Sequence, residues 1–340
     1  MLDDVAKNDI RAIIRELDPD TFNGKKVLVT GGAGFIGSWL CDVLVESGTY
    51  ITCLDNLSSG SLKNVNSIIR HERFKFINAD VNEWSSNEKF DIIIHCASIP
   101  SPEDYMTRPI EAVLPNSLAL INMLEKARKD GSTLLFTSTS EVYGDATVIP
   151  TPEEYWGYVN PIGLRSCYDE SKRFGEALCF AYHRQYGVDV RIARIFNTYG
   201  PKIDVNAGYA RVIPRFIMQA LRGEPITVHG DGRQTRSFTY ITDTITALIK
   251  MLATSKAEGE VINIGNPHET SIIELANMIK KLTNSTSPIL FTKPRPDDPR
   301  RRCPDITKAE KILGWEPRTS LEEGLKRTIK WMKLNIRRHR

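Results

Sequence analysis

The chain has 340 residues, of which 41% are hydrophobic, and its 45 Lys and Arg against 42 Asp and Glu give a formal net charge of +3. This composition excludes a disordered, a collagen-like or a disulfide-stapled protein, because the chain is long and apolar enough to bury a core. The balanced charge produces no strong global field, so we expect neither nucleic acid nor a membrane surface as a partner.

The first twenty residues predict an amphipathic helix rather than a targeting signal. They are charged throughout and lack the apolar core of a signal peptide, and no later run approaches the length of a membrane span. Ile10, Ile13, Ile14 and Leu17 recur at helical spacing, so we assign residues 1–22 to an N-terminal helical extension that packs on the domain or on a partner subunit.

Strands alternate with helices from Lys25 to about Gly200. A parallel sheet covered by helices on both faces is the structure that such alternation favours. We therefore predict an α/β fold with a Rossmann-type doubly wound sheet in residues 23–200; its strands are 27–29, 50–54, 74–77, 92–95, 133–137 and 190–195.

After Gly200 the sequence changes to Gly- and Pro-rich turns separated by shorter elements. We predict strands at 226–229 and 261–264 and helices from about Asp243, at 271–282 and at 321–332. Residues 201–340 are therefore expected to form a smaller α/β domain beside one cleft, although the chain can cross back over this boundary.

A glycine triplet follows the first predicted strand. Gly31, Gly34 and Gly37 have the spacing GxxGxxG and open a helix, as expected of a loop that lets the backbone approach a pyrophosphate. Asp55 ends the next strand, eighteen residues past Gly37, where a carboxylate can accept both hydroxyls of an adenosine ribose. Because that carboxylate would repel a 2′-phosphate, we predict NAD rather than NADP as the cofactor.

Further NAD contacts are expected around this loop and at the carboxyl ends of the following strands, where nucleotides bind in open α/β sheets. For Asp80 an exposed strand-end carboxylate is nearly as good an interpretation as an adenine contact, and Cys96 is expected to act through its backbone or in packing. The predicted contacts comprise Phe35, Ile36, Asn56, Ser59, Gly60, Asp80, Val81, Cys96, Ala97, Ser98 and Ser138.

The segment SCYDESKRFGEAL carries a Tyr–Lys pair. Tyr168 and Lys172 lie four residues apart and share one helix face, where an ammonium group lowers the pKa of a nearby phenol and makes Tyr168 a general base. A surface pair is the alternative. The hydroxyl-rich strand end before it, with Thr139, Ser140 and Glu141, favours a site that oxidises a secondary alcohol beside a nicotinamide.

Together, TGGAGFIG, LDN, STSEVYG and YxxxK resemble the extended short-chain dehydrogenases/reductases that act on nucleotide sugars. The resemblance runs from about Gly24 to near the C-terminus. It implies a homodimer and a C-terminal domain that holds the nucleotide diphosphate, with candidate substrate residues Asn197, Arg211, His229, Gln234, Arg236 and Arg302.

The Ser140–Glu141 pair, followed by EYWGYVNPIGLRSCYDESKR, is similar to the UDP-glucuronate decarboxylases, which form UDP-xylose. This resemblance implies oxidation at C4 of UDP-glucuronate, loss of CO2 from the β-keto acid and return of the hydride. Tyr168 and Lys172 would act at O4, Thr139 or Ser140 would hydrogen-bond O4, and Glu141 would orient the sugar or a water. A 4,6-dehydratase carries an Asp–Glu pair where this chain has Ser140–Glu141.

Several assignments stay open. Arg236 could clamp the diphosphate or pair with the sugar carboxylate, and Arg302 could serve the diphosphate or belong to a solvated basic run with its two neighbours. The sequence departs from the decarboxylase pattern at Ser171, where that pattern has glycine, and at His229, where it has an aromatic residue. Alternatives are another nucleotide-sugar 4-epimerase or 4,6-dehydratase and, less favoured, a non-catalytic NAD-binding protein.

The six cysteines are scattered without a CxxC pair, which predicts free thiols, no metal centre and a reducing, cytoplasmic environment.

Overall fold

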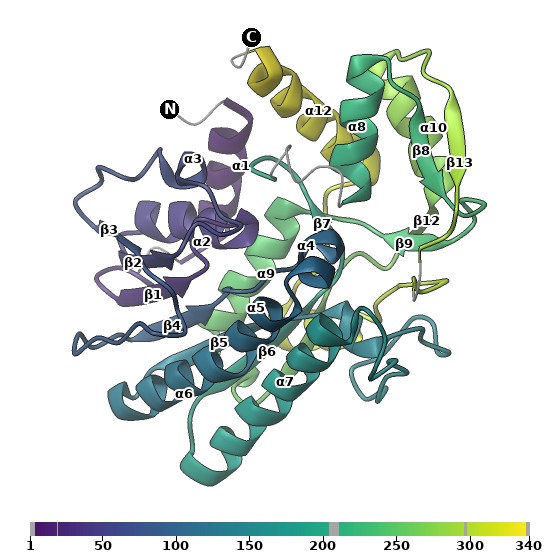
Figure 1. Cartoon of the computed structure of the whole chain (residues 1–340). Helices are drawn as coiled ribbons and strands as arrows, with labels where there is room; N and C mark the ends of the chain where they lie inside the picture. Colours follow the sequence, from purple (N-terminus) through teal and green to yellow (C-terminus); the bar gives the residue numbers. More distant parts are fainter. Residues whose placement is uncertain (1–3, 19, 204–210, 296–297, 338–340) are drawn as a thin grey trace.

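A computed structural model describes residues 4–18, 20–203, 211–295 and 298–337. Its centre is a seven-stranded sheet in which every neighbouring pair of strands is parallel (Figure 1). The strand order places β1 inside the sheet, with β2 and β3 on one side and four later strands on the other. In that order the strands are β11 (Val261–Ile264), β6 (Val190–Ile195), β5 (Thr133–Thr139), β4 (Ile92–His95), β1 (Lys26–Thr30), β2 (Tyr50–Asp55) and β3 (Phe74–Asn78). The predicted doubly wound sheet is confirmed.

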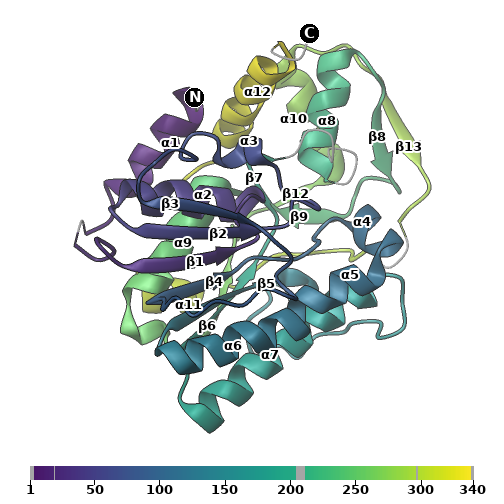
Figure 2. The same ribbon diagram turned by 60° about the vertical axis from the view of Figure 1, so that its left-hand side comes forward.

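Helices cover both faces of this sheet, because its central strands are apolar on both sides (Figure 2). On one face, α6 (Leu118–Asp130) and α7 (Ser166–Tyr186) lie next to each other and contribute Met123 and Cys179 to the core. On the other, α2 (Phe35–Glu46) and α9 (Ile241–Ala253) bury Trp39 and Leu248. Short helices complete the layers: α3 (Leu62–Val65), α4 (Pro102–Thr107), α5 (Pro109–Val113) and α11 (Thr307–Leu313).

The C-terminal lobe stands above the carboxyl edge of the sheet (Figure 1). Small sheets hold it together: β8 (Ile226–His229) pairs with β13 (Ile289–Thr292), and β9 (Thr235–Ser237) pairs with β12 (Glu269–Ser271). Its helices are α8 (Val212–Arg222), α10 (Ile272–Thr283) and α12 (Leu321–Arg337), while β7 (Thr198–Tyr199) and β10 (Thr239–Tyr240) join it to the main sheet. Strand β11 returns to the main sheet at its edge, beside β6.

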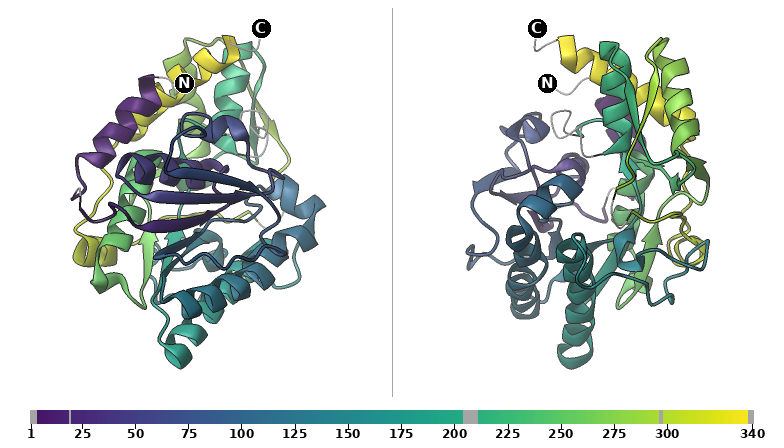
Figure 3. Two further views of the ribbon diagram at one scale, coloured as in Figure 1. Left: turned by 90° about the vertical axis from the view of Figure 1, so that its left-hand side faces the viewer. Right: turned by 45° about the vertical axis from the view of Figure 1, so that its right-hand side comes forward.

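The N-terminal helix α1 (Asp4–Ile14) packs on this same chain, against α2, α9 and α12 (Figure 3). Its buried face includes Ile10 and Ile13, and the buried carboxylate of Asp9 accepts hydrogen bonds from Tyr240 Oη at 2.6 Å and from Arg327 Nη1 at 2.9 Å. The Asp9 carboxylate therefore links α1 to both β10 and α12.

Candidate active site

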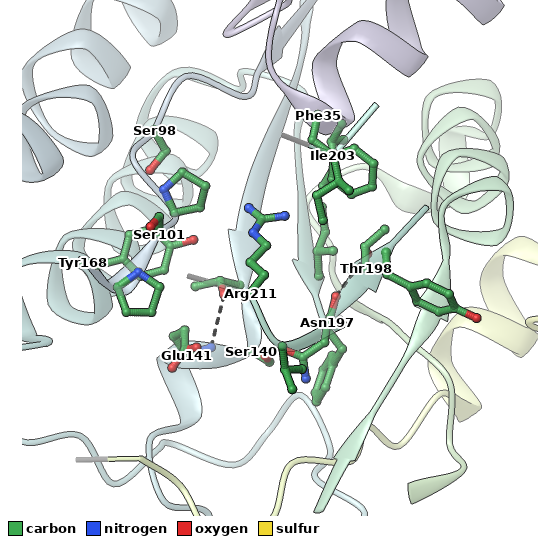
Figure 4. A pocket seen from close by; sticks show the side chains of 18 of the residues that line it. Phe35, Ser98, Ser101, Ser140, Glu141, Tyr168, Asn197, Thr198, Ile203 and Arg211 are labelled. Carbon is green, nitrogen blue, oxygen red and sulfur yellow. Dashed lines mark hydrogen bonds between the residues drawn. The ribbon is translucent and has the colours of Figure 1, made fainter. Parts of the chain in front are cut away.

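A cavity of about 370 Å³ lies between the carboxyl edge of the main sheet and the C-terminal lobe (Figure 4). Its wall is built from the glycine loop before α2, the ends of β4, β5 and β6, the start of α7, and residues of α8, β8 and β9. Parallel strands all end at one edge, so residues far apart in sequence meet there.

The glycine loop is shaped by two close backbone approaches. Gly31 has a positive φ of 66°, and a Cβ on it would lie 2.7 Å from the backbone nitrogen of Ala97. A Cβ on Gly37 would overlap the carbonyl oxygen of Gly31. No side chain caps the first turn of α2, whose N-cap is Gly34, so its backbone N–H groups are available to an anion in the cavity.

Asp55 lies beside this loop, where NAD would present its adenosine ribose. It is buried, and its carboxylate accepts hydrogen bonds from the backbone nitrogens of Ala33 at 2.9 Å and Leu57 at 2.8 Å. Burial raises its pKa, while these hydrogen bonds lower it. A glycine loop, an open helix N-terminus and a fixed carboxylate together fit NAD.

The predicted NAD contacts divide into two groups. Those in the cavity wall are Gly31, Gly34, Phe35, Ile36, Gly37, Asp55, Ser59, Cys96, Ser98, Ser138, Tyr168 and Lys172. Asn56, Gly60, Asp80, Val81 and Ala97 lie outside the wall. Among these, Asn56 Nδ2 donates a hydrogen bond to the Asp80 carboxylate at 3.2 Å. The same carboxylate accepts a hydrogen bond from the backbone nitrogen of Asn82 in the following turn.

Tyr168 and Lys172 lie in the first turns of α7, line the cavity and are buried. Figure 4 shows Tyr168 at the cavity wall. The Lys172 Nζ donates to the carbonyl oxygen of Thr137 at 2.7 Å and lies 6.0 Å from the centre of the Tyr168 ring. The ring of Tyr105 stacks on that of Tyr168, with centroids 5.2 Å apart and planes within 3°. The phenol of Tyr168 thus lies between its own helix turn and the ring of Tyr105.

The expectation that Lys172 lowers the pKa of Tyr168 was wrong for the protein chain by itself. Burial raises the pKa of Tyr168 above its ordinary value, the Glu141 carboxylate raises it further, and a hydrogen bond with Thr139 only partly offsets them. Burial also lowers the pKa of Lys172 to about 8. The ammonium group points at the Thr137 carbonyl and is desolvated, so it gives the phenol little help.

Glu141 is held by two arginines. Its carboxylate accepts two hydrogen bonds from Arg302, each at 2.6 Å, and one from Arg165 Nη2 at 2.6 Å. Burial alone would raise the pKa of Glu141, but the charges of Arg302 and Arg165 outweigh it and lower this pKa to about 2. Glu141 is therefore ionised at neutral pH.

Two further carboxyl groups surround this cluster. Asp298 pairs with Arg236 at 2.8 Å and lies 3.9 Å from Arg165. Burial and the Glu141 charge raise the pKa of Asp169 to about 8, so Asp169 carries a proton at neutral pH, but it is not part of the cavity wall. Arg165, Arg236 and Arg302 thus face the carboxyl groups of Glu141 and Asp298, so three basic side chains meet two acidic ones, an excess that suits an anionic ligand.

The three consecutive arginines 300–302 have different environments. Arg300 is 82% exposed and Arg301 is 55% exposed, and they pair with Asp145 and Glu269. Arg302, only 6% exposed, turns inward to Glu141. The interpretation of this run as a solvated basic face is therefore wrong for Arg302, because its guanidinium has a buried carboxylate partner.

The remaining predicted substrate residues line the same cavity: Thr139, Ser140, Asn197, Arg211, His229, Gln234 and Arg236. Arg211 extends into its centre, between Tyr168 and the side chains of Phe35 and Ile203 (Figure 4). From the sequence IDVNAGYARVI we predict that the loop 203–213 lies over the nucleotide, but residues 204–210 are outside the described residues.

Several site residues had no recognised signal in the sequence. Arg165 lies one helical turn before Tyr168, a spacing that could have suggested a shared face. Tyr105 and Asp298 reach the site only through folding, from α4 and from the segment after β13. Ser101, whose buried hydroxyl has no hydrogen-bond partner in the structure, also lines the cavity and offers a contact to a polar ligand.

The chain matches one described protein family over most of its length. A family model described as the NAD dependent epimerase/dehydratase family matches residues 27–265. The chain belongs to this family. Within the NAD dependent epimerase/dehydratase family, it is 49% identical over 312 residues to UDP-glucuronic acid decarboxylase 1 of Xenopus tropicalis, covering 92% of this chain and 73% of that protein.

A second member, UDP-glucuronic acid decarboxylase 3 of Arabidopsis thaliana, is 48% identical over 301 residues, or 88% of this chain and 86% of that protein. Among solved structures of the epimerase/dehydratase family, the UDP-glucuronic acid 4-epimerase of Bacillus cereus, in complex with UDP-glucuronic acid and NAD, superposes with a TM-score of 0.82. It is 31% identical, and the match covers 91% of this chain and 99% of the epimerase. The fold is thus shared by members with different reactions.

No helix in the described part of the chain is both long and apolar enough to cross a membrane. In the same residues, no group of three or more His, Cys, Asp and Glu side chains is arranged to hold a metal ion.

Proposed function

We propose that this protein is an NAD-dependent UDP-glucuronate decarboxylase that forms UDP-xylose and CO2. The cofactor fits the glycine loop and Asp55, and the substrate fits the arginine-rich half of the cavity. In this proposal residues 23–200 hold mainly NAD and residues 201–340 hold mainly the UDP-sugar. The curated relatives that match most of this chain support this choice within the family.

The observation that carries the proposal is the Glu141 carboxylate beside Ser140, which accepts three hydrogen bonds of 2.6 Å from Arg165 and Arg302. Elimination of water from a sugar needs a proton donor for the departing hydroxyl, and a carboxyl group with a pKa of about 2 cannot donate one at neutral pH. Decarboxylation of a β-keto acid needs no such donor, because the departing group is CO2. The site therefore favours loss of the carboxylate over expulsion of a hydroxyl.

The residues divide the chemistry as follows. Tyr168 removes the proton of the C4 hydroxyl and returns it after decarboxylation, a hydrogen bond with Thr139 partly offsets the raised pKa of the phenol, and Lys172 Nζ lies 6.0 Å from the centre of its ring. The glycine loop and Asp55 would hold NAD, which would supply the acceptor and later the donor of the C4 hydride. Ser140 hydrogen-bonds O4 and thereby stabilises the enolate oxygen that forms there when CO2 departs.

Glu141 orients the sugar or a water through its fixed carboxylate. The arginines that hold Glu141 also set the local charge. Arg165, Arg236 and Arg302 keep a net positive potential next to the sugar, which admits a substrate that carries a carboxylate of its own. Arg236 could still serve either that carboxylate or the diphosphate. Either role uses the planar fork of its guanidinium group.

Purified protein supplied with UDP-glucuronate and NAD tests the proposal, with products followed by mass spectrometry. We expect UDP-pentose, formed by loss of one CO2, from the wild type and none from Tyr168→Phe. An epimerised UDP-glucuronate without CO2 release would instead make the protein a 4-epimerase like the structural neighbour from Bacillus cereus. Unchanged substrate would refute both the decarboxylase and the 4-epimerase function.

We also propose that the protein is a homodimer. Large apolar side chains are exposed along α5, α6 and α7, where Ile110 is 67%, Leu118 is 46% and Phe174 is 49% exposed. These helices run along one edge of the molecule (Figure 1). A second copy packed on this edge would cover them, and light scattering of wild type and Phe174→Glu tests this, with a monomeric variant as the expected result.

All six cysteines are free. We propose a reducing compartment such as the cytoplasm on that ground.

A further inference from the structure

Where the C-terminal lobe lines the cavity, a histidine and an arginine form a pair that has no role in the reaction described above. Arg215 lies on α8 and His229 ends β8, and both line the cavity. Arg215 Nη1 lies 3.0 Å from His229 Nε2, and Arg215 Nη2 lies 3.3 Å from the carbonyl oxygen of Thr227. The guanidinium therefore lies across the end of β8.

The protonation of His229 follows from its partners. A guanidinium can only donate, so Nε2 of His229 must accept the hydrogen bond from Arg215 and must carry no proton. The other ring nitrogen, Nδ1, lies 2.9 Å from the hydroxyl of Thr292 and carries the proton of the neutral ring. The backbone carbonyl of His229 in turn accepts a hydrogen bond from Gln234 Nε2 at 2.7 Å. The imidazole is thus fixed in one orientation and one tautomer.

The surroundings keep His229 neutral and Arg215 charged. Burial lowers the pKa of His229, and the charges of Arg215 and Arg295 lower it further, while Asp298 opposes them. Burial and the Arg295 charge lower the pKa of Arg215 to about 10, so it remains a cation at neutral pH. Glu103, which pairs with Arg295 at 3.2 Å, is close enough for its charge to raise the pKa of Arg215.

We propose that His229 is a positioning residue that presents the Arg215 guanidinium to the nucleoside diphosphate of the substrate. The inference rests on the proposed function, because it assigns this end of the cavity to the anionic nucleotide. A buried arginine whose position is fixed by a neutral acceptor loses little freedom when it binds an anion. Phenylalanine at position 229 would fill similar space but could not accept the hydrogen bond.

The test is a double-variant cycle on the affinity of the holoenzyme for UDP, measured by calorimetry at pH 7.5. Arg215→Gln should weaken UDP binding by about 10–100-fold, the range for a lost hydrogen bond to a charged group. His229→Phe should weaken it by about tenfold. The double variant should be no weaker than Arg215→Gln alone, since His229 acts through Arg215. Additive losses, or wild-type affinity in His229→Phe, would overturn the inference.

The conservative variant His229→Gln gives a second readout. A glutamine oxygen can accept from Arg215 but does not titrate, so UDP affinity should be retained at pH 7.5. As the pH falls through the lowered pKa of His229, the wild type should come to bind UDP more weakly than His229→Gln, because a protonated His229 cannot accept from Arg215 and repels it. Parallel pH profiles for the two proteins would contradict the proposed tautomer.

Kinetics and circular dichroism separate this role from misfolding and from failure of the proposed function. The variants should raise KM for UDP-glucuronate and leave kcat nearly unchanged, because neither residue belongs to the reacting cluster. Equal losses in kcat with normal KM would overturn the positioning role. If wild-type holoenzyme does not bind UDP at all, the nucleotide-sugar function itself is refuted; if it does and the variants bind equally well, only the role of His229 is refuted.

Discussion

Replacing Glu141 by glutamine tests the buried ion cluster most directly. The substitution keeps the size of the side chain but removes the charge that Arg165 and Arg302 share, and these arginine side chains are 8% and 6% exposed. Breaking a buried pair in this way costs about 3–5 kcal/mol, because the remaining charges stay buried without a partner. The free energy of unfolding at pH 7 should therefore fall substantially.

The pKa of Glu141 gives a second route to this magnitude. A drop from 4.5 to about 2 in the folded state corresponds to about 3 kcal/mol of stabilisation. Because the folded pKa is depressed, this stabilisation is present above the ordinary pKa and is lost as the pH falls toward 2. The difference between wild type and Glu141→Gln should fall to roughly 40% of its neutral value at pH 3.

Urea unfolding at several pH values measures both quantities. Asp169 limits the effect: it lies 4.0 Å from Arg165, and in the variant it can ionise and compensate in part. Glu322→Gln is the matched control, because its partner Lys326 is solvent-exposed and its loss should leave stability unchanged. Equal stability of wild type and Glu141→Gln at pH 7, or a difference that grows toward acid pH, would refute the reasoning.

Three further predictions concern the NAD-binding part of the cavity and the charged groups buried near it. Asp55→Asn should weaken NAD binding by about 10–100-fold, measured by fluorescence titration, because an amide cannot accept from two ribose hydroxyls as a carboxylate does. Lys202→Met should lower the free energy of unfolding by about 3–5 kcal/mol, since it leaves Asp42 buried without its cation; the double variant Lys202→Met/Asp42→Leu should recover most of the loss. The pKa of Lys172 is about 8 in the folded chain and 10.5 in the unfolded chain, so the unfolded chain binds more protons between pH 8 and pH 10.5. In that range the free energy of unfolding of the wild type should therefore rise with pH, and urea unfolding of Lys172→Met should lack this rise.

Some of the contacts behind these predictions could be predicted from the sequence, and others could not. Glycine spacing and the Tyr–Lys pair are local features, so the NAD loop and the start of α7 could be placed from a few consecutive residues. Even there, the sequence did not show the protonation behaviour of the groups: burial and the Glu141 charge raise the pKa of Tyr168.

By itself, the sequence determined the order of strands and helices, because apolar periodicity and turn residues act over short distances. It also placed Asp55 at the end of β2 and Glu141 after β5, since strand ends are local. Only the tertiary structure decided that Arg165 and Arg302 meet at Glu141 and that Arg215 meets His229. These partners come together because parallel strands bring distant segments to one edge of the sheet, and their charges interact strongly because they are buried there. Neither effect can be predicted from a short stretch of sequence.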